Sequence, residues 1–157
     1  MKPILIYLPT RVIFGLGTLE MLRDHAPEFG KKALLVTTGL RKTDIVPSTI
    51  GILRSANIDV VLYDCVESNP KASNIDDAVQ LFKDERCDFV IGLGGGSAMD
   101  AAKAVAVVAK NGGYIRDYVP MIKATRKNIK ESFPVICIST TAGTGSEVTM
   151  FSVITIP

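Results

Sequence analysis

The sequence predicts an α/β fold in which a parallel sheet is covered by helices on both faces. Short runs of β-branched and other apolar residues alternate along the chain with longer segments that carry a single apolar stripe. Each short run is apolar at nearly every position, which is typical of strands buried on both sides. The repeated order of strand, helix and strand is typical of Rossmann-like sheets.

Five runs are expected to form strands, and four segments are expected to form helices. The helices begin near residues that can cap a first turn, such as Thr18, and end near breakers such as Pro27. The expected strands are residues 12–14, 33–37, 60–63, 89–93 and 134–139, and the expected helices are residues 18–25, 46–53, 74–85 and 97–110.

The last segment, residues 148–156, is strongly strand-like and is followed only by Pro157. A strand needs a neighbour to satisfy its backbone hydrogen bonds. We therefore expect residues 1–157 to form one α/β domain that is truncated before a further domain. A homo-oligomer through the exposed C-terminal strand or domain face would satisfy such a strand.

Composition narrows the classes of function. The 157 residues carry 18 basic and 16 acidic side chains, and this net charge of +2 is too small to favour nucleic acid or a membrane surface as the partner. No apolar stretch approaches the ~20 residues of a membrane span. The three cysteines lie far apart without a CxxC pair, so we expect a reducing, cytoplasmic location.

The chain has one histidine, His25, in a polar segment at a helix end. A metal site would need further histidines or clustered cysteines, and a serine hydrolase would need a GxSxG turn. We therefore expect His25 to be a surface residue, and we assign no catalytic and no metal-binding residue to this chain.

The strongest motif is a glycine loop, Gly94-Gly95-Gly96-Ser97, between a buried strand and a helix. Bare glycine backbone and the free N–H groups of a first helical turn together suit a phosphate or pyrophosphate. The loop fits neither the GxGxxG nor the GxxxxGK[ST] pattern. The alternative is a tight turn in which Ser97 and Asp100 form a capping-box-like pair. Lys103 is either an ion-pair partner of Asp100 or a cofactor contact.

A second loop, residues 139–149, follows the last expected strand of the sheet. It holds six hydroxyl side chains and two glycines, which can line a nucleotide without adding charge. A polar turn is the alternative. A third loop carries Thr38 where enzymes selective for NAD usually place an acidic residue. Because Arg41 and Lys42 are close in sequence, we expect NADP to be preferred over NAD.

Residues 94–103 and 140–147 together resemble the paired signature of the iron-containing (group III) alcohol dehydrogenases, and residues 12–17 and 67–70 also match that family. The resemblance covers essentially the whole chain. It implies a dehydroquinate synthase-like N-terminal domain that binds NAD(P), followed by a helical domain that holds Fe²⁺ or Zn²⁺ through one Asp and three His.

The resemblance also implies roles for individual residues. Gly95, Gly96 and Ser97 would hold the pyrophosphate with Asp100 nearby, Asn69 would lie near the cofactor, and Thr38 would replace the ribose-binding Asp of many members. The adenosine and nicotinamide side would be lined by Thr140, Thr141, Thr144 and Thr149.

The metal-binding helical domain is expected to be absent from this chain, since no ligand set for the metal is present. The sequence therefore predicts the cofactor-binding domain of a metal-dependent alcohol dehydrogenase, inactive or nearly so in isolation. The alternatives are a stand-alone NAD(P)-binding or assembly module and a fragment of a glycerol dehydrogenase-like relative. The threonine-rich stretch at residues 140–147 favours the alcohol dehydrogenase branch.

Overall fold

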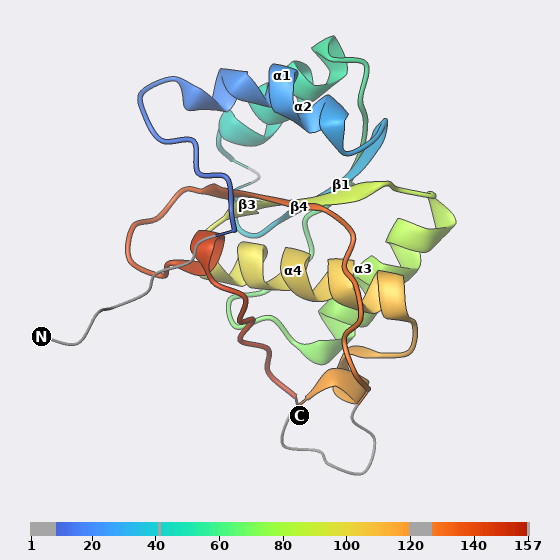
Figure 1. Cartoon of the computed structure of the whole chain (residues 1–157). Helices are drawn as coiled ribbons and strands as arrows, with labels where there is room; N and C mark the ends of the chain where they lie inside the picture. The colour runs from blue at the N-terminus through green and yellow to red at the C-terminus, as the bar shows by residue number, and fades with distance from the viewer. Residues whose placement is uncertain (1–8, 41, 120–126, 157) are drawn as a thin grey trace, which may run out of the picture.

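A computed structural model describes residues 9–40, 42–119 and 127–156. Its centre is a four-stranded sheet in the order β2-β1-β3-β4, and all three strand pairs are parallel (Figure 1). The strands are β1 (Lys32–Thr37), β2 (Asp59–Tyr63), β3 (Phe89–Gly94) and β4 (Val135–Ser139). The expected α/β class with a parallel sheet is confirmed.

Helices lie on both sides of the sheet. In Figure 1, α1 and α2 lie above it, and α3 and α4 lie below it. The α-helices are α1 (Leu22–His25), α2 (Ile45–Ser55), α3 (Ala72–Asp84) and α4 (Gly96–Asn111). Short 3₁₀ helices are η1 (Thr18–Met21), η2 (Ala26–Glu28), η3 (Ile115–Tyr118) and η4 (Ser146–Val148).

Two apolar cores separate along the strands because side chains alternate between the two faces of a sheet. Leu34 and Val36 of β1 pack in the core with α3 and α4. Leu35 of the same strand packs in the opposite core with α1 and α2. Both β1 and β3 are buried almost completely, which explains their unbroken apolar runs.

The topology places a switch point at the centre of the sheet. The chain leaves β1 through α2 on one face, whereas it leaves the neighbouring β3 through α4 on the other face. The loops that follow these two strands therefore diverge, and ligands of open α/β sheets bind in the crevice outside the carboxyl ends of such strands.

Helix α4 approaches the sheet closely at Gly92 of β3. A Cβ atom on Gly92 would lie 2.8 Å from the Ala102 Cβ and 2.9 Å from the Met99 Cα. The absence of a side chain at Gly92 thus lets α4 rest on the strand. This contact fixes where the first turn of α4 stands relative to the end of β3.

Two expected strands are wrong. Residues 12–14 and 148–156 are not strands, and the second segment holds only one isolated bridge, between Thr155 and Lys71. Both segments have high β propensity, but a strand exists only where a neighbouring strand pairs with it. The expected helix at residues 18–25 is a 3₁₀ turn, η1, that continues into the one-turn α1.

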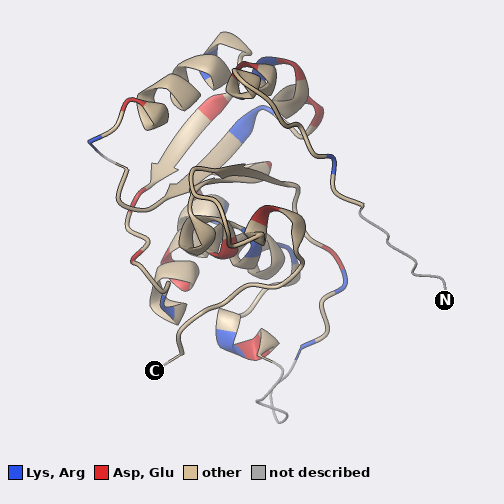
Figure 2. Cartoon of the chain, turned by 90° about the vertical axis from the view of Figure 1, so that its left-hand side faces the viewer, with Lys and Arg blue, Asp and Glu red and all other residues tan. Residues whose placement is uncertain are grey.

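Acidic and basic residues are interspersed along the chain, as the near-balanced composition predicts (Figure 2). Among the described residues, no helix has the length and apolar character needed to cross a membrane. The expectations about nucleic acid and membrane partners stay predictions.

Candidate nucleotide-binding site

The glycine loop and the second loop lie side by side at the carboxyl edge of the sheet. Gly94 at the end of β3 is in register with Ser139 at the end of β4. One residue further, the Thr140 N–H donates to the Gly94 carbonyl at 2.9 Å. The sequence expectation that both loops share one edge of the sheet is therefore confirmed.

The N-terminus of α4 begins inside the glycine loop. Gly95 is the N-cap residue and has no side chain to cap the helix. The Met99 N–H donates to the Gly95 carbonyl at 3.2 Å, so the N–H groups of the preceding turn lie ahead of the intrahelical hydrogen bonds. These donors and the positive end of the helix dipole suit an anionic group.

The alternative in which Ser97 and Asp100 form a capping box is wrong. The helix begins at Gly96, so Ser97 lies within its first turn. The Ser97 hydroxyl instead accepts a hydrogen bond from the Asn69 backbone N–H at 3.3 Å. Asn69 is exposed and has a φ of 59°, and this contact brings the turn after β2 to the start of α4.

The three glycines serve different geometric needs. Gly94 has a φ of 146°, a conformation that L side chains rarely adopt. A Cβ atom on Gly95 would lie 3.2 Å from the Thr141 Oγ1, and one on Gly96 would lie 3.0 Å from the Thr144 Cγ2. The bare backbone of the glycine loop and the threonines of the second loop therefore border the same space.

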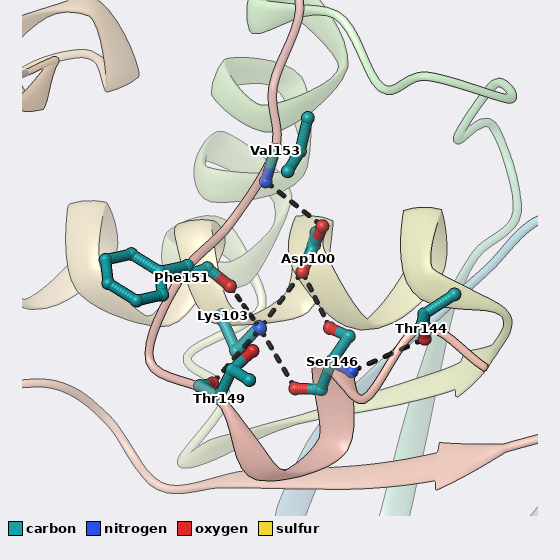
Figure 3. Close-up of polar contacts among 7 residues, drawn as sticks. All are labelled: Asp100, Lys103, Thr144, Ser146, Thr149, Phe151 and Val153. Carbon is teal, nitrogen blue, oxygen red and sulfur yellow. Dashed lines mark hydrogen bonds and ion pairs between the residues drawn. The ribbon is translucent and has the colours of Figure 1, made fainter.

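A polar network fastens the end of the second loop to α4 (Figure 3). Asp100 accepts hydrogen bonds from the Ser146 hydroxyl at 2.6 Å and from the Val153 N–H at 3.0 Å. The Lys103 Nζ lies 3.0 Å from the Asp100 Oδ1, which confirms the ion-pair alternative for Lys103. The same ammonium donates to the carbonyls of Ser146, Thr149 and Phe151.

Ser146 is the residue of this network that the sequence reasoning missed. It is 4% exposed, whereas Thr140, Thr141, Thr144 and Thr149 are all exposed. Its position in a hydroxyl-rich stretch carried no signal of burial. The contact with Asp100 joins residues 46 positions apart, which only the fold brings together.

Thr38 follows β1 directly and is half-buried next to the switch point. Lys42 is exposed, and Arg41 lies outside the described residues. No described contact joins Thr38 to the glycine loop or the second loop. Its neighbour Thr37 is 1% exposed, and the Thr37 hydroxyl has no hydrogen-bond partner among the described residues.

A groove of about 1100 Å³ runs beside β4, between the second loop and the N-terminal segment. Thr140, Thr141 and Thr149 line it, together with Lys103 and Cys137. The glycine loop, Thr38, Asn69 and Thr144 do not line this groove. Of the predicted cofactor residues, three threonines thus line the groove, whereas Gly95, Gly96 and Ser97 belong to the glycine loop and the others lie outside both.

Burial changes the acid–base behaviour of two thiols. Desolvation raises the pKa of Cys137, at the groove, to about 11, and it raises the pKa of Cys87 to about 11. Cys65 is exposed, and all three cysteines are free thiols. The neutral form of Cys137 makes it an apolar wall of the groove rather than a nucleophile.

No group of three or more metal-binding side chains exists among the described residues. His25, the one histidine of the chain, lies in α1. Its Nδ1 lies 3.2 Å from the Glu28 Oε1 and 3.2 Å from the Arg11 Nη1. The structure therefore places His25 in a partly exposed ion-pair cluster.

The comparisons with known proteins all point to the same family of enzymes. Residues 9–157 match the sequence model described as iron-containing alcohol dehydrogenase. The methanol:N,N-dimethyl-4-nitrosoaniline oxidoreductase of Rhodococcus erythropolis is 44% identical over 147 residues, which cover 92% of this chain and 34% of that protein. The NAD-dependent methanol dehydrogenase of Bacillus methanolicus is 36% identical over 151 residues, 95% of this chain and 39% of that protein.

A solved structure points to the same family as these relatives. An archaeal halo-thermophilic alcohol dehydrogenase from a Red Sea brine pool superposes with a TM-score of 0.92 and 37% identity, covering 99% of this chain and 41% of that one. The chain thus spans about a third of the length of the curated relatives it matches. By its sequence match and its fold, the chain belongs to the iron-containing alcohol dehydrogenase family.

Proposed function

We propose that this chain binds NADP or NAD and is the cofactor-binding domain of a metal-dependent alcohol dehydrogenase, which interconverts alcohols and aldehydes by hydride transfer. The observation that carries the proposal is the meeting of two loops at the carboxyl edge of a parallel sheet. There the buried β3 ends at Gly94, α4 begins at Gly96 with free N–H donors, and the threonines of the second loop lie alongside.

The chain's own groups suit the parts of a dinucleotide. The backbone N–H groups of Gly95, Gly96 and Ser97 suit the pyrophosphate, because they carry donors and no side chain charge. The exposed hydroxyls of Thr140, Thr141, Thr144 and Thr149, with Asn69, suit the neutral sugar and base groups. When bound, the nicotinamide ring supplies the acceptor or donor of the hydride.

The neutral Thr38 supports a preference for NADP. A carboxylate at the end of β1 would hydrogen-bond the ribose 2′-OH of NAD and repel the 2′-phosphate of NADP. Thr38 lacks this charge, and the exposed Lys42 adds a nearby cation. The NAD-dependent methanol dehydrogenase of Bacillus methanolicus is 36% identical to this chain, and a comparison of NADPH with NADH therefore tests this preference.

The described residues do not fit the metal of the family. They contain no group of metal-binding side chains, and His25 lies in an ion-pair cluster with Glu28. No step of the reaction is therefore assigned to a residue of this chain. We propose that the 157-residue chain by itself has little or no dehydrogenase activity, with or without Fe²⁺.

Calorimetric titration of the chain with NADPH and with NADH tests the proposed cofactor binding. A stoichiometry of one dinucleotide per chain is the expected result, and absence of binding by both would refute the proposal. Oxidation of ethanol or 1,2-propanediol with added Fe²⁺ tests the second part. Turnover at the rate of a full-length member would refute the proposed inactivity and place a catalytic centre in this chain.

A further inference from the structure

Apart from its polar contacts with α4, the second loop has little secondary structure and little burial to fix its position. Its threonines are exposed, and its only regular element is the 3₁₀ turn η4 (Ser146–Val148). Beyond η4, Met150 is 84% exposed and Phe151 is 73% exposed. The polar contacts of the loop with α4 therefore matter more than its apolar packing for where its backbone lies.

These contacts converge on two side chains of α4 (Figure 3). Asp100 and Lys103 stand one helical turn apart, and their side chains are only 12% and 15% exposed. Together they reach Ser146, Thr149, Phe151 and Val153, four positions within residues 146–153, which run from the second loop into the segment after it. We call these six residues the latch.

Both oxygens of the Asp100 carboxylate are engaged within the protein. Oδ1 lies 2.6 Å from the Ser146 hydroxyl and 3.0 Å from the Lys103 Nζ, and Oδ2 accepts from the Val153 N–H. A buried carboxylate with these partners has little capacity left for a ribose or a phosphate. Lys103 likewise donates to three carbonyls and pairs with Asp100, which uses its hydrogen-bonding capacity.

We propose that Asp100 and Lys103 are positioning residues for the nucleotide site and that they touch no part of the nucleotide. They hold residues 144–153 against α4, and this keeps Thr144 within contact distance of the glycine loop. The Ser146 N–H lies 3.4 Å from the Thr144 hydroxyl, so the position of Ser146 is transmitted to Thr144. The inference rests on the proposed NAD(P) binding.

Asp100 and Lys103 carry opposite charges, so substitutions that remove one charge or the other have different expected effects. Removal of Lys103 leaves a buried carboxylate without its ion partner, close to the turn that receives the pyrophosphate, and this is costly. Asp100→Asn keeps the shape and one acceptor but loses the ion pair. Lys103→Arg keeps the positive charge and several donors, so it should restore much of what Lys103→Met loses.

The experiment combines three measurements on the full chain with NADPH as the probe. Calorimetry gives the Kd, thermal unfolding gives the Tm, and amide hydrogen exchange gives the protection of residues 144–153. The variants are Asp100→Asn, Lys103→Met, their double variant and Lys103→Arg. The matched control is Lys110→Met, which removes an exposed ion pair with Glu131 at the other end of the same helix.

Asp100→Asn and Lys103→Met are each expected to weaken NADPH binding about 5- to 150-fold, the usual range of coupling between sites, and to lose protection at residues 144–153 in parallel. The double variant should be little worse than the worse single variant, because both act through one loop. Lys103→Arg should recover most of the affinity, and Lys110→Met should change nothing. Should Asp100→Asn fail to fold, Ser146→Ala removes only the hydrogen bond between the Ser146 hydroxyl and Asp100, and the same three measurements apply to it.

Weaker binding with unchanged protection would show direct contact with the nucleotide and overturn the inference. Lost protection with unchanged Kd would show that the latch serves stability alone and would also overturn it. If the unsubstituted chain binds no dinucleotide, the proposed function fails and this inference fails with it. If the unsubstituted chain binds and the variants bind equally well, only this inference fails.

Discussion

Gly96 and Thr144 stand so close that a methyl group on Gly96 would lie 3.0 Å from the Thr144 Cγ2. This distance is tighter than an ordinary van der Waals contact, although Gly96 itself lies in α4 with an ordinary helical backbone. The side chain is therefore missing for reasons of space. Any larger residue at this position requires the Thr144 side chain to move by at least a few tenths of an ångström.

Gly96→Val should abolish dinucleotide binding while leaving the sheet folded, because its added methyl groups occupy the space between the two loops. The measurement is calorimetric titration with NADPH, alongside far-UV circular dichroism. Gly51→Val is the matched control, since Gly51 lies in α2 with open space around the site of its missing Cβ. Unchanged affinity in a folded Gly96→Val protein would refute this placement of the pyrophosphate.

Thr38→Asp should reverse the cofactor preference. The unsubstituted chain is expected to bind NADPH more tightly than NADH, and the new carboxylate should repel the 2′-phosphate and accept from the 2′-OH. A shift of about tenfold in the ratio of the two dissociation constants corresponds to about 1.4 kcal/mol. Thr43→Asp, at an exposed position nearby, is the control. Equal dissociation constants in the unsubstituted chain would contradict the argument from Thr38.

Gly92→Ala should destabilise the fold by about 1–3 kcal/mol, the range typical of an overpacked core. The new methyl group would lie 2.8 Å from the Ala102 Cβ and 2.9 Å from the Met99 Cα, so α4 must move away from β3. Urea denaturation gives the change in the free energy of unfolding. Gly51→Ala has no such neighbours and should be neutral or slightly stabilising. A Gly92→Ala protein of unchanged stability would contradict the close approach of α4.

Alkaline pH should destabilise the protein partly through Cys137. Burial raises the pKa of Cys137 from 9.0 in an ordinary thiol to about 11 in the folded chain. The unfolded chain therefore loses the thiol proton first, and the corresponding stability, complete below about pH 9, is lost as the pH rises to about 11. Denaturation from pH 8 to pH 11 should show a shallower loss for Cys137→Ala than for the unsubstituted chain. Parallel curves would rule out this contribution.

We propose that the chain self-associates through its C-terminal segment. Met150, Phe151 and Val153 are 84%, 73% and 76% exposed, and such clustered apolar side chains favour association. Phe151→Lys should shift light-scattering masses towards the monomer. Tyr114→Lys, at an exposed aromatic residue of another segment, should leave them unchanged. A monodisperse monomer of the unsubstituted chain at high concentration would contradict the proposal.

The sequence was sufficient for the central fold and for the neighbouring positions of the loops. The strands at the core of the sheet are apolar on both faces, short and bounded by glycines, and this pattern favours buried parallel strands. Once the strands are parallel, their carboxyl ends share an edge. The meeting of Gly94 with Thr140 follows from that geometry without any knowledge of side-chain contacts.

The segments outside the central sheet could not be predicted in this way. Residues 12–14 and 148–156 have strand-like composition, yet neither is a strand among the described residues, because strand formation depends on a neighbour that composition does not specify. The helix start was also misplaced. Ser97 is a good cap by residue type, but the helix begins one residue earlier, at Gly96, with Gly95 as its N-cap.

By itself, then, the sequence determined the sheet, the glycine loop and the family that the chain resembles, because these depend on local patterns of hydrophobicity and on short motifs. Only the tertiary structure decided which groups of the protein contact Asp100. Its partners Ser146 and Val153 are 46 and 53 positions away, and a carboxylate near the start of a helix can serve a ligand or a distant loop equally well. These contacts depend on which groups the fold brings within hydrogen-bonding distance, and because the pair is largely buried, removal of one member leaves the other charge unpaired at a high cost.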